Sequence, residues 1–222
     1  MKQVLVVFFF LPLFACAQRN ELSLSLGATW TSGQNSTTSL LLPLPCPVTQ
    51  PQCDVISSSS SSSVGFTFAA AYAIRVLPAG AADLYLEFPV VATPGHDVTT
   101  TFRNPLAGPI SGTDSTSLLF FTPSARLKFL PSARISPWAT IGGGLARISF
   151  VNQNKAVGCL QFGGGLDFKT PLPHLLVRTE ARDFWSQGAL QSLSISSFVS
   201  SSSVSPEHQH HVFAGGGVVV SF

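Results

Sequence analysis

The sequence predicts an all-β protein, an eight-stranded antiparallel up-and-down transmembrane β-barrel. First, the chain is apolar: its mean hydropathy is +0.36, and charged residues make up 10% of it, against about 25% in ordinary soluble domains. Second, no stretch beyond the N-terminal segment has the ~18 continuous apolar residues of a membrane helix, which leaves the closed barrel as the membrane-compatible fold. Third, the chain ends on an alternating strand at Phe222, whereas the ends of soluble domains usually fray into water.

The N-terminus has the features of a signal peptide, which we expect to span residues 1–17. Lys2 provides a positive charge, an apolar run follows, and Ala15-Cys16-Ala17 forms a small-residue cleavage site. Residues 18–222 then form one barrel domain. The alternative is lipoprotein processing, because Leu13-Phe14-Ala15-Cys16 loosely resembles a lipobox, and this would place a lipid on Cys16.

The first four expected strands alternate with a period of two. They cover about 21–30, 63–77, 82–91 and 117–130. In the first strand, Leu22, Leu24 and Leu26 share one parity, meaning that their side chains point to the same face of the sheet. Ser23 and Ser25 share the other parity. In the next three, Phe, Leu, Val and Tyr residues alternate with glycine, alanine, threonine or charged residues.

The last four strands are expected at about 135–150, 156–170, 175–187 and 212–222. The fifth strand is ambiguous, because Trp138 and Ile148 favour one parity while Ile141 and Leu145 favour the other. A β-bulge at residues 142–144 would reconcile the two. Strands six to eight alternate clearly, and their glycine triplets fit a tightly curved small barrel, in which some positions have no room for a side chain.

The connections alternate in length. Short turns are expected around residues 78–80, 131–133 and 171–173, whereas long links are expected at about 31–62, 92–116 and 188–210, with a short one at 151–155. Serine runs at 57–63 and 200–203 lie in these long links and are expected to be solvated and mobile. Outer-membrane barrels have short periplasmic turns and long extracellular loops. We therefore expect both termini to be periplasmic.

The charged residues indicate which parity faces inward. If the apolar parity faced inward, the outer surface would consist largely of Gly, Ala, Ser and Thr, which is poor for solubility. If the apolar parity faces lipid instead, the charged residues of the other parity lie in the lumen. The expected lumen network comprises Arg75, Glu87, Arg126, Lys128, Asp167, Lys169, Arg178, Glu180 and Arg182. An unpaired buried charge costs several kcal/mol, so we expect Glu87 and Glu180 to pair with Arg126, Arg178 and Arg182 and to block the bore.

Aromatic residues gather near the expected strand ends, as in the interfacial girdles of membrane barrels. Trp30 and Trp185 lie toward the long loops, whereas Phe129, Trp138, Phe168 and Phe222 lie toward the short turns.

Three cysteines remain after the expected cleavage. Cys46 and Cys53 lie in one loop, and an exported protein can form disulfides, so we expect them to pair. Cys159 lies within a strand and is expected to be a small buried side chain.

The sequence offers little support for catalysis or ligand binding. No G-x-S-x-G motif is present, and the net charge of +2 does not favour nucleic-acid binding. The one histidine cluster, His208, His210 and His211, is expected to be a solvated loop end and not a metal site. We therefore expect no enzyme activity, no cofactor and no metal.

The motifs together resemble one family. The signal peptide, the eight strands, Pro137–Leu145 (PWATIGGGL), Leu176–Phe184 (LVRTEARDF) and the terminal Phe222 are similar to the OmpA/OmpX-type outer-membrane β-barrel superfamily. The resemblance covers nearly the whole mature chain and implies that Phe222 is the assembly signal read by the barrel-assembly machinery. The full-length OmpA pattern includes a peptidoglycan-binding domain after the barrel; we expect none here, and therefore no role in tethering the envelope through such a domain.

The resemblance implies a monomer in the bacterial outer membrane, in contact with outer-membrane lipids and lipopolysaccharide. We expect a structural or surface-recognition role carried by the long extracellular loops. The alternatives are a narrow pore or lateral transport path for small solutes and, with less support, a lipid-modifying enzyme.

Overall fold

The structure, a computed structural model, describes residues 20–32, 34–39, 55–104, 108–150, 153–187 and 208–222. Within these ranges no helix is long and apolar enough to cross a membrane. The expected signal peptide, the Cys46–Cys53 pair and the serine run at 200–203 lie outside the described residues.

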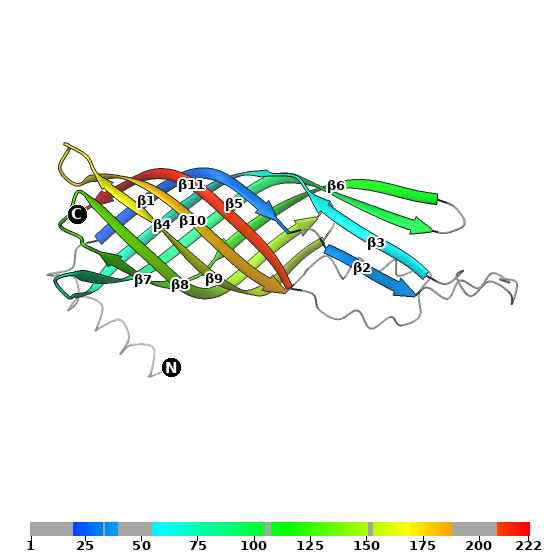
Figure 1. The fold of residues 1–222 in the computed structure, drawn as a ribbon, viewed down its shortest axis with the longest axis horizontal. Helices are drawn as coiled ribbons and strands as arrows, with labels where there is room; N and C mark the ends of the chain where they lie inside the picture. Colours follow the sequence, from blue (N-terminus) through cyan, green and yellow to red (C-terminus); the bar gives the residue numbers. More distant parts are fainter. Residues whose placement is uncertain (1–19, 33, 40–54, 105–107, 151–152, 188–207) are drawn as a thin grey trace, which may run out of the picture.

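All described elements are β-strands, shown in Figure 1. The strands are β1 (Asn20–Thr31), β2 (Gln34–Ser39), β3 (Val55–Ser62), β4 (Gly65–Pro78), β5 (Ala82–Asn104), β6 (Gly108–Phe121), β7 (Ser124–Phe129), β8 (Ile135–Phe150), β9 (Gln153–Lys169), β10 (Leu175–Gln187) and β11 (His208–Ser221).

Eight wall positions form a closed antiparallel ring, in the order β1, β4, β5, β6 with β7, β8, β9, β10, β11 and back to β1. The predicted eight-stranded barrel is therefore confirmed. β6 and β7 are one wall position interrupted at Thr122 and Pro123, because proline has no amide hydrogen for the ladder. The seam joins the two ends of the chain: Glu21 lies opposite Ser221, and the amide of Phe222 donates to the carbonyl of Asn20 at 3.0 Å.

The apolar parity faces outward, as the alternation predicted. In β1, Leu22, Leu24 and Leu26 are 43%, 55% and 54% exposed, whereas Ser23 and Ser25 are buried. When the sheet closes into a narrow barrel, the side chains of one parity point into the lumen and are buried there. The side chains of the other parity remain on the outer surface.

The expected bulge at residues 142–144 is wrong. β8 pairs with β9 in one continuous register from Ile135 opposite Phe168 to Phe150 opposite Gln153. Trp138 and Ile148 satisfy the alternation by facing the lumen, while Ile141 and Leu145 face outward. Register shifts occur elsewhere, between Arg75 and Leu77 and between Thr93 and His96.

Half of the wall extends past the barrel, so two of the expected long loops are partly strand. β3 pairs with β5 from Ser57 opposite Arg103 to Ser62 opposite Val98, and β2 pairs with β3. β5 and β6 continue as a hairpin to Asn104 opposite Gly108. We call this extension, made of β2, β3, residues 96–104 of β5 and residues 108–116 of β6, the blade; Figure 1 shows it beyond the end of the barrel opposite the C-terminus.

The blade corrects the expectation that Ser57–Ser63 is a mobile run. Ser57 to Ser62 are paired on both sides, with β2 and with β5, over most of their length. Serine can occupy a paired strand, because strand formation depends strongly on the neighbouring strands. The composition of the serine run alone does not show that β2 and β5 provide backbone hydrogen-bond partners.

Candidate functional site: the barrel lumen

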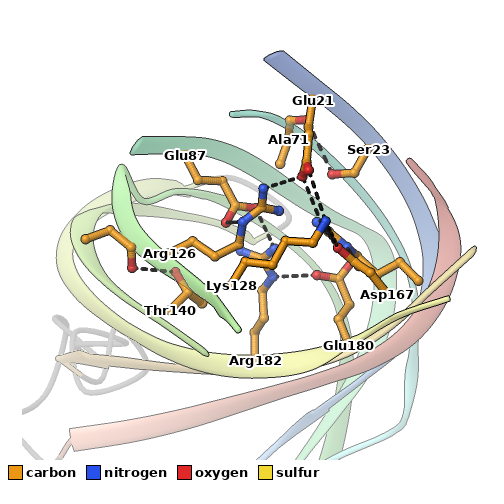
Figure 2. A network of polar contacts seen from close by, with 12 residues as sticks. Glu21, Ser23, Ala71, Glu87, Arg126, Lys128, Thr140, Asp167, Glu180 and Arg182 are labelled. Carbon is orange, nitrogen blue, oxygen red and sulfur yellow. Dashed lines mark hydrogen bonds and ion pairs between the residues drawn. The ribbon is translucent and has the colours of Figure 1, made fainter. Parts of the chain in front are cut away.

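A network of buried charges lies in the lumen of the barrel, and Figure 2 shows its side chains pointing toward one another from several strands. Its acids are Glu21, Glu87, Asp167 and Glu180, and its bases are Arg126, Lys128, Arg178 and Arg182. All eight side chains are at most 4% exposed. Four negative and four positive charges balance, which matters because each ion has lost its hydration.

The shortest contacts join neighbouring strands, residues of one strand, and strands on opposite sides of the bore. Arg178 makes a bidentate pair with Asp167, with Nε–Oδ1 and Nη2–Oδ2 distances of 2.7 and 3.0 Å. Arg182 bridges Glu180 at 2.7 Å and Glu87 at 2.8 Å. Lys128 contacts Asp167 at 2.7 Å and Glu21 at 3.0 Å. Charge-assisted bonds of this kind hold the walls in register and occupy the bore.

The network differs in membership from the expected one. Lys169 is exposed at the rim, where its Nζ donates to the Ser132 carbonyl at 2.6 Å, and Arg75 pairs with Asp83 at 3.4 Å with its side chain 24% exposed. Both lie too near the turn end to be enclosed. The expected partners of Arg178 were Glu87 and Glu180, but its short contacts are with Asp167.

Glu21 is the network member that sequence reasoning missed. Its Oε2 lies 2.5 Å from Arg126 Nη2, and its Oε1 lies 3.0 Å from Lys128 Nζ. The signal was present in the sequence, because Glu21 shares the parity of Ser23 and Ser25, which was assigned to the interior.

The assignment of Trp138 to an aromatic girdle is wrong. Its side chain is 3% exposed, and the guanidinium carbons of Arg178, Arg182 and Arg126 lie 4.9, 5.4 and 5.8 Å from its ring. Room for the indole exists because Gly165 is the residue opposite it on β9. Contact of cations with an aromatic face is favourable, so Trp138 packs the middle of the network.

The other girdle residues face outward. Trp30, Phe129 and Phe222 are 46%, 41% and 62% exposed, and Trp185 and Phe168 are half-buried on the same outward parity.

We expect fluorescence quenching to separate Trp138 from Trp30 and Trp185, the chain having three tryptophans. In variants that keep one tryptophan and replace the other two with phenylalanine, brominated acyl chains should quench Trp30 and Trp185 strongly and Trp138 weakly. Strong quenching of Trp138 would contradict a lumenal position.

An apolar layer closes the lumen toward the blade. Phe120, Phe184 and Phe213 are fully buried, and the rings of Phe120 and Phe184 stack at 4.3 Å. The cluster also contains Ala69, Val91, Leu118, Ala146, Ile148, Val157 and Cys159. Cys159 is a small buried side chain, as expected, and it is a free cysteine.

A polar ring follows the apolar layer at the blade end. The hydroxyl of Thr67 lies 2.7 Å from that of Thr29 and 2.8 Å from that of Thr93. His211 is 1% exposed, and its Nδ1 and Nε2 lie 3.0 Å from Thr31 Oγ1 and 3.3 Å from Ser186 Oγ. The expectation of a solvated histidine cluster is therefore wrong for His211, because β11 begins at His208 and alternation turns this ring inward.

At the opposite end, a cavity of about 280 Å³ opens between the short turns. Glu21, Tyr85 and Lys128 line its inner side, so the charge network forms its floor. In the part of the chain that the structure describes, no three His, Cys, Asp or Glu residues gather to hold a metal ion.

No family model matches the sequence, and no curated protein matches it. Solved structures do. Neisserial surface protein A (NspA) is 12% identical, with 93% of this chain and 99% of that chain covered, at a TM-score of 0.48. The outer membrane protein OprG from Pseudomonas aeruginosa is 10% identical, with 91% and 96% covered, at a TM-score of 0.51.

This chain has the outer-membrane β-barrel fold. Three observations support this fold: the ring of eight walls, the apolar outer surface and the likeness to OprG. At 10% identity that likeness concerns the fold alone. The narrower resemblance to the OmpA/OmpX type stays a prediction.

Proposed function

We propose that this protein is an integral protein of the bacterial outer membrane whose closed barrel anchors a surface-exposed recognition blade. The continuation of four barrel walls into the blade carries the proposal. The β3–β5 pairs follow the same register as the β4–β5 pairs, so the blade is a continuation of the wall. Such an extension is stiffer than a flexible loop and can present a surface at a defined height.

The composition of the blade fits water and not lipid. The hydroxyl of Thr99 lies 3.0 Å from that of Thr113, and the hydroxyl of Thr101 lies 2.9 Å from that of Ser111. These exposed pairs form a row of hydroxyl groups on one face. The sequence of β2, QNSTTS, is also entirely polar. A polar sheet of this kind favours hydrogen-bonded recognition at the cell surface over burial in a bilayer.

The lumen argues against the alternative of a narrow pore. A solute would have to cross the fully buried Phe120, Phe184 and Phe213 and then the paired charges beneath them. The first barrier is apolar and the second is charged. An apolar solute would therefore be disfavoured at the charge network, and a polar solute would be disfavoured at the phenylalanine layer. We propose that the barrel serves as an anchor and not as a conduit.

Planar-bilayer recording is expected to detect no steady conductance for the native protein. A Phe120→Ala/Phe184→Ala variant should also remain silent, because the charge network still blocks the bore. Stepwise openings of the native protein would contradict the anchor role, and openings of the variant alone would show that the apolar layer is the sole barrier.

The expected partners follow from this placement. The outward Leu, Phe and Val side chains would contact outer-membrane lipids and lipopolysaccharide. The barrel-assembly machinery would read the C-terminal strand and Phe222, and the protein would act as a monomer with both termini periplasmic.

Epitope insertion tests the orientation. A tag between Asn104 and Gly108, at the end of the β5–β6 hairpin, should be stained by antibody on intact cells, whereas a tag between Ser132 and Ala133 should be stained only after the outer membrane is permeabilised. The reverse pattern would place the blade in the periplasm and overturn the recognition role.

A further inference from the structure

One carboxylate faces outward from the barrel. Asp183 lies between Arg182 and Phe184, which both face the lumen, so its side chain is on the outer parity of β10. Among the described residues of the barrel walls, it is the only acid on that parity. Its side chain is 34% exposed, and its Oδ1 is buried with no hydrogen-bond partner among the described residues. An unpaired buried oxygen is costly, and such a cost is often associated with a functional role.

Asp183 lies at the blade-end aromatic girdle. Across the outer surface, one row of paired residues runs Trp30, Val212, Asp183 and Phe162. The next row toward the blade runs His210, Trp185 and Leu160. Tryptophans mark the level of lipid headgroups, where acyl chains meet polar groups. The carboxylate is therefore surrounded by apolar side chains at the level of the ester bonds of a lipid.

Asp183 orients a histidine. His210 Nδ1 lies 2.8 Å from Asp183 Oδ2, and the indole of Trp185 stacks on the imidazole at a centroid distance of 6.5 Å. A carboxylate at Nδ1 holds the proton on that nitrogen, which leaves the lone pair on Nε2. The imidazole is 52% exposed, so this base is accessible from the outside of the barrel.

A hydroxyl group lies on the other side of His210. The amide of Ser32 donates to the His210 carbonyl at 2.9 Å, and the amide of His210 donates to Ser32 Oγ at 3.1 Å. Ser32 Oγ accepts in this bond, and no acceptor for its own proton is recorded among the described residues. Ser32 directly follows β1, His210 lies near the start of β11 and Asp183 lies in the last part of β10, and these three strands are neighbours.

We propose that Ser32, His210 and Asp183 form a hydrolytic site for the acyl esters of outer-leaflet lipids. This activity goes beyond the recognition role and departs from the expectation that the chain is not an enzyme. Ser32 Oγ and His210 Nε2 would be the reacting groups, and Asp183 is the positioning residue. In this structure Ser32 Oγ contacts the backbone amide of His210, and its hydrogen bond to Nε2 would form when substrate binds, as catalytic hydrogen bonds often tighten only then.

The reaction balances with water as the co-reactant. Ser32 Oγ bonds to the ester carbonyl carbon as its proton passes to His210 Nε2. The bond from that carbon to the lipid alcohol oxygen then breaks, and the alcohol takes the proton. Water repeats the attack on the acyl-serine through His210, which releases the fatty acid and returns the proton to Ser32.

The first test is covalent labelling by an alkyl fluorophosphonate of the full chain in phospholipid vesicles, located by peptide mass spectrometry. Ser32 should be labelled, and His210→Gln and Asp183→Asn should slow labelling by at least about 100-fold. Ser63 is the matched control, because its exposed Oγ also accepts a backbone amide, that of Asp97 at 3.0 Å. Equal labelling of Ser32 and Ser63, or labelling of Ser32 independent of His210, would overturn the proposal.

The second test measures fatty acid released from vesicles of phospholipid alone and from vesicles containing lipopolysaccharide, which distinguishes the two ester sources. Release should disappear in Ser32→Ala and persist in Ser63→Ala. Each variant must retain the urea unfolding midpoint of the native protein, which the outward position of these residues favours. No release from either vesicle, or undiminished release by folded Ser32→Ala, would exclude this site.

Discussion

Asp167→Asn is expected to lower the free energy of unfolding by about 3–5 kcal/mol, the usual cost of removing one partner of a buried ion pair. Asparagine keeps the shape of the side chain, so the change removes charge without opening a cavity. Arg178 would lose its bidentate partner, and Lys128 would lose its contact at 2.7 Å. Both cations would then depend on Glu21, which lies 3.6 Å from Arg178 and 3.0 Å from Lys128.

Lys169→Gln is the matched control for this substitution. Lys169 lies two residues from Asp167 on the same strand and parity, but it is exposed and bonded only to a turn carbonyl in the described structure. Its change should alter stability by less than about 1 kcal/mol. Urea unfolding in lipid vesicles measures both. Equal small losses would mean that lumenal water, and not ion pairing, satisfies the buried cations.

Gly165→Ala is expected to destabilise the barrel by about 3 kcal/mol, at the upper end of the usual cost of overpacking. A Cβ atom at this position would lie 2.0 Å from the Thr179 carbonyl oxygen and 2.8 Å from the Trp138 ring. The carbonyl belongs to the neighbouring wall, so relief requires the β9–β10 ladder to move. The indole is held in place by the arginines around it.

Gly158→Ala provides the comparison within the same strand. A Cβ atom there meets nothing within 4 Å, so stability should change by less than about 0.5 kcal/mol. The measurement is again the urea midpoint in vesicles. If the two alanine variants were equally stable, the close approach of the walls at Gly165 would not be maintained in the membrane.

Much of the fold was predictable, because a barrel wall repeats one local rule. Alternation along Leu22, Leu24 and Leu26 assigned the outward face without reference to any other strand. The same rule assigned Arg126, Arg178 and Arg182 to the lumen, where they lie. It would also have placed Glu21 correctly.

The candidate site was predicted less well, because its ion pairs depend on the register between strands. Parity alone does not say that Asp167, and not Glu180, meets Arg178 at 2.7 Å. The misassigned Trp138 has the same origin. Its inward position requires a glycine opposite it on the neighbouring strand β9, and the β8–β9 register places Gly165 there.

The barrel, its eight walls and the faces of most residues could be predicted, since these follow from hydrophobic periodicity and from the need to satisfy backbone hydrogen bonds in lipid. Three other features became visible only in the folded chain. These are the layering of charge and phenylalanine in the lumen, the pairing of serine-rich segments into the blade, and the meeting of Ser32, His210 and Asp183 on the outer surface. Each depends on which strands become neighbours and in what register, and that information is shared between segments far apart in the chain.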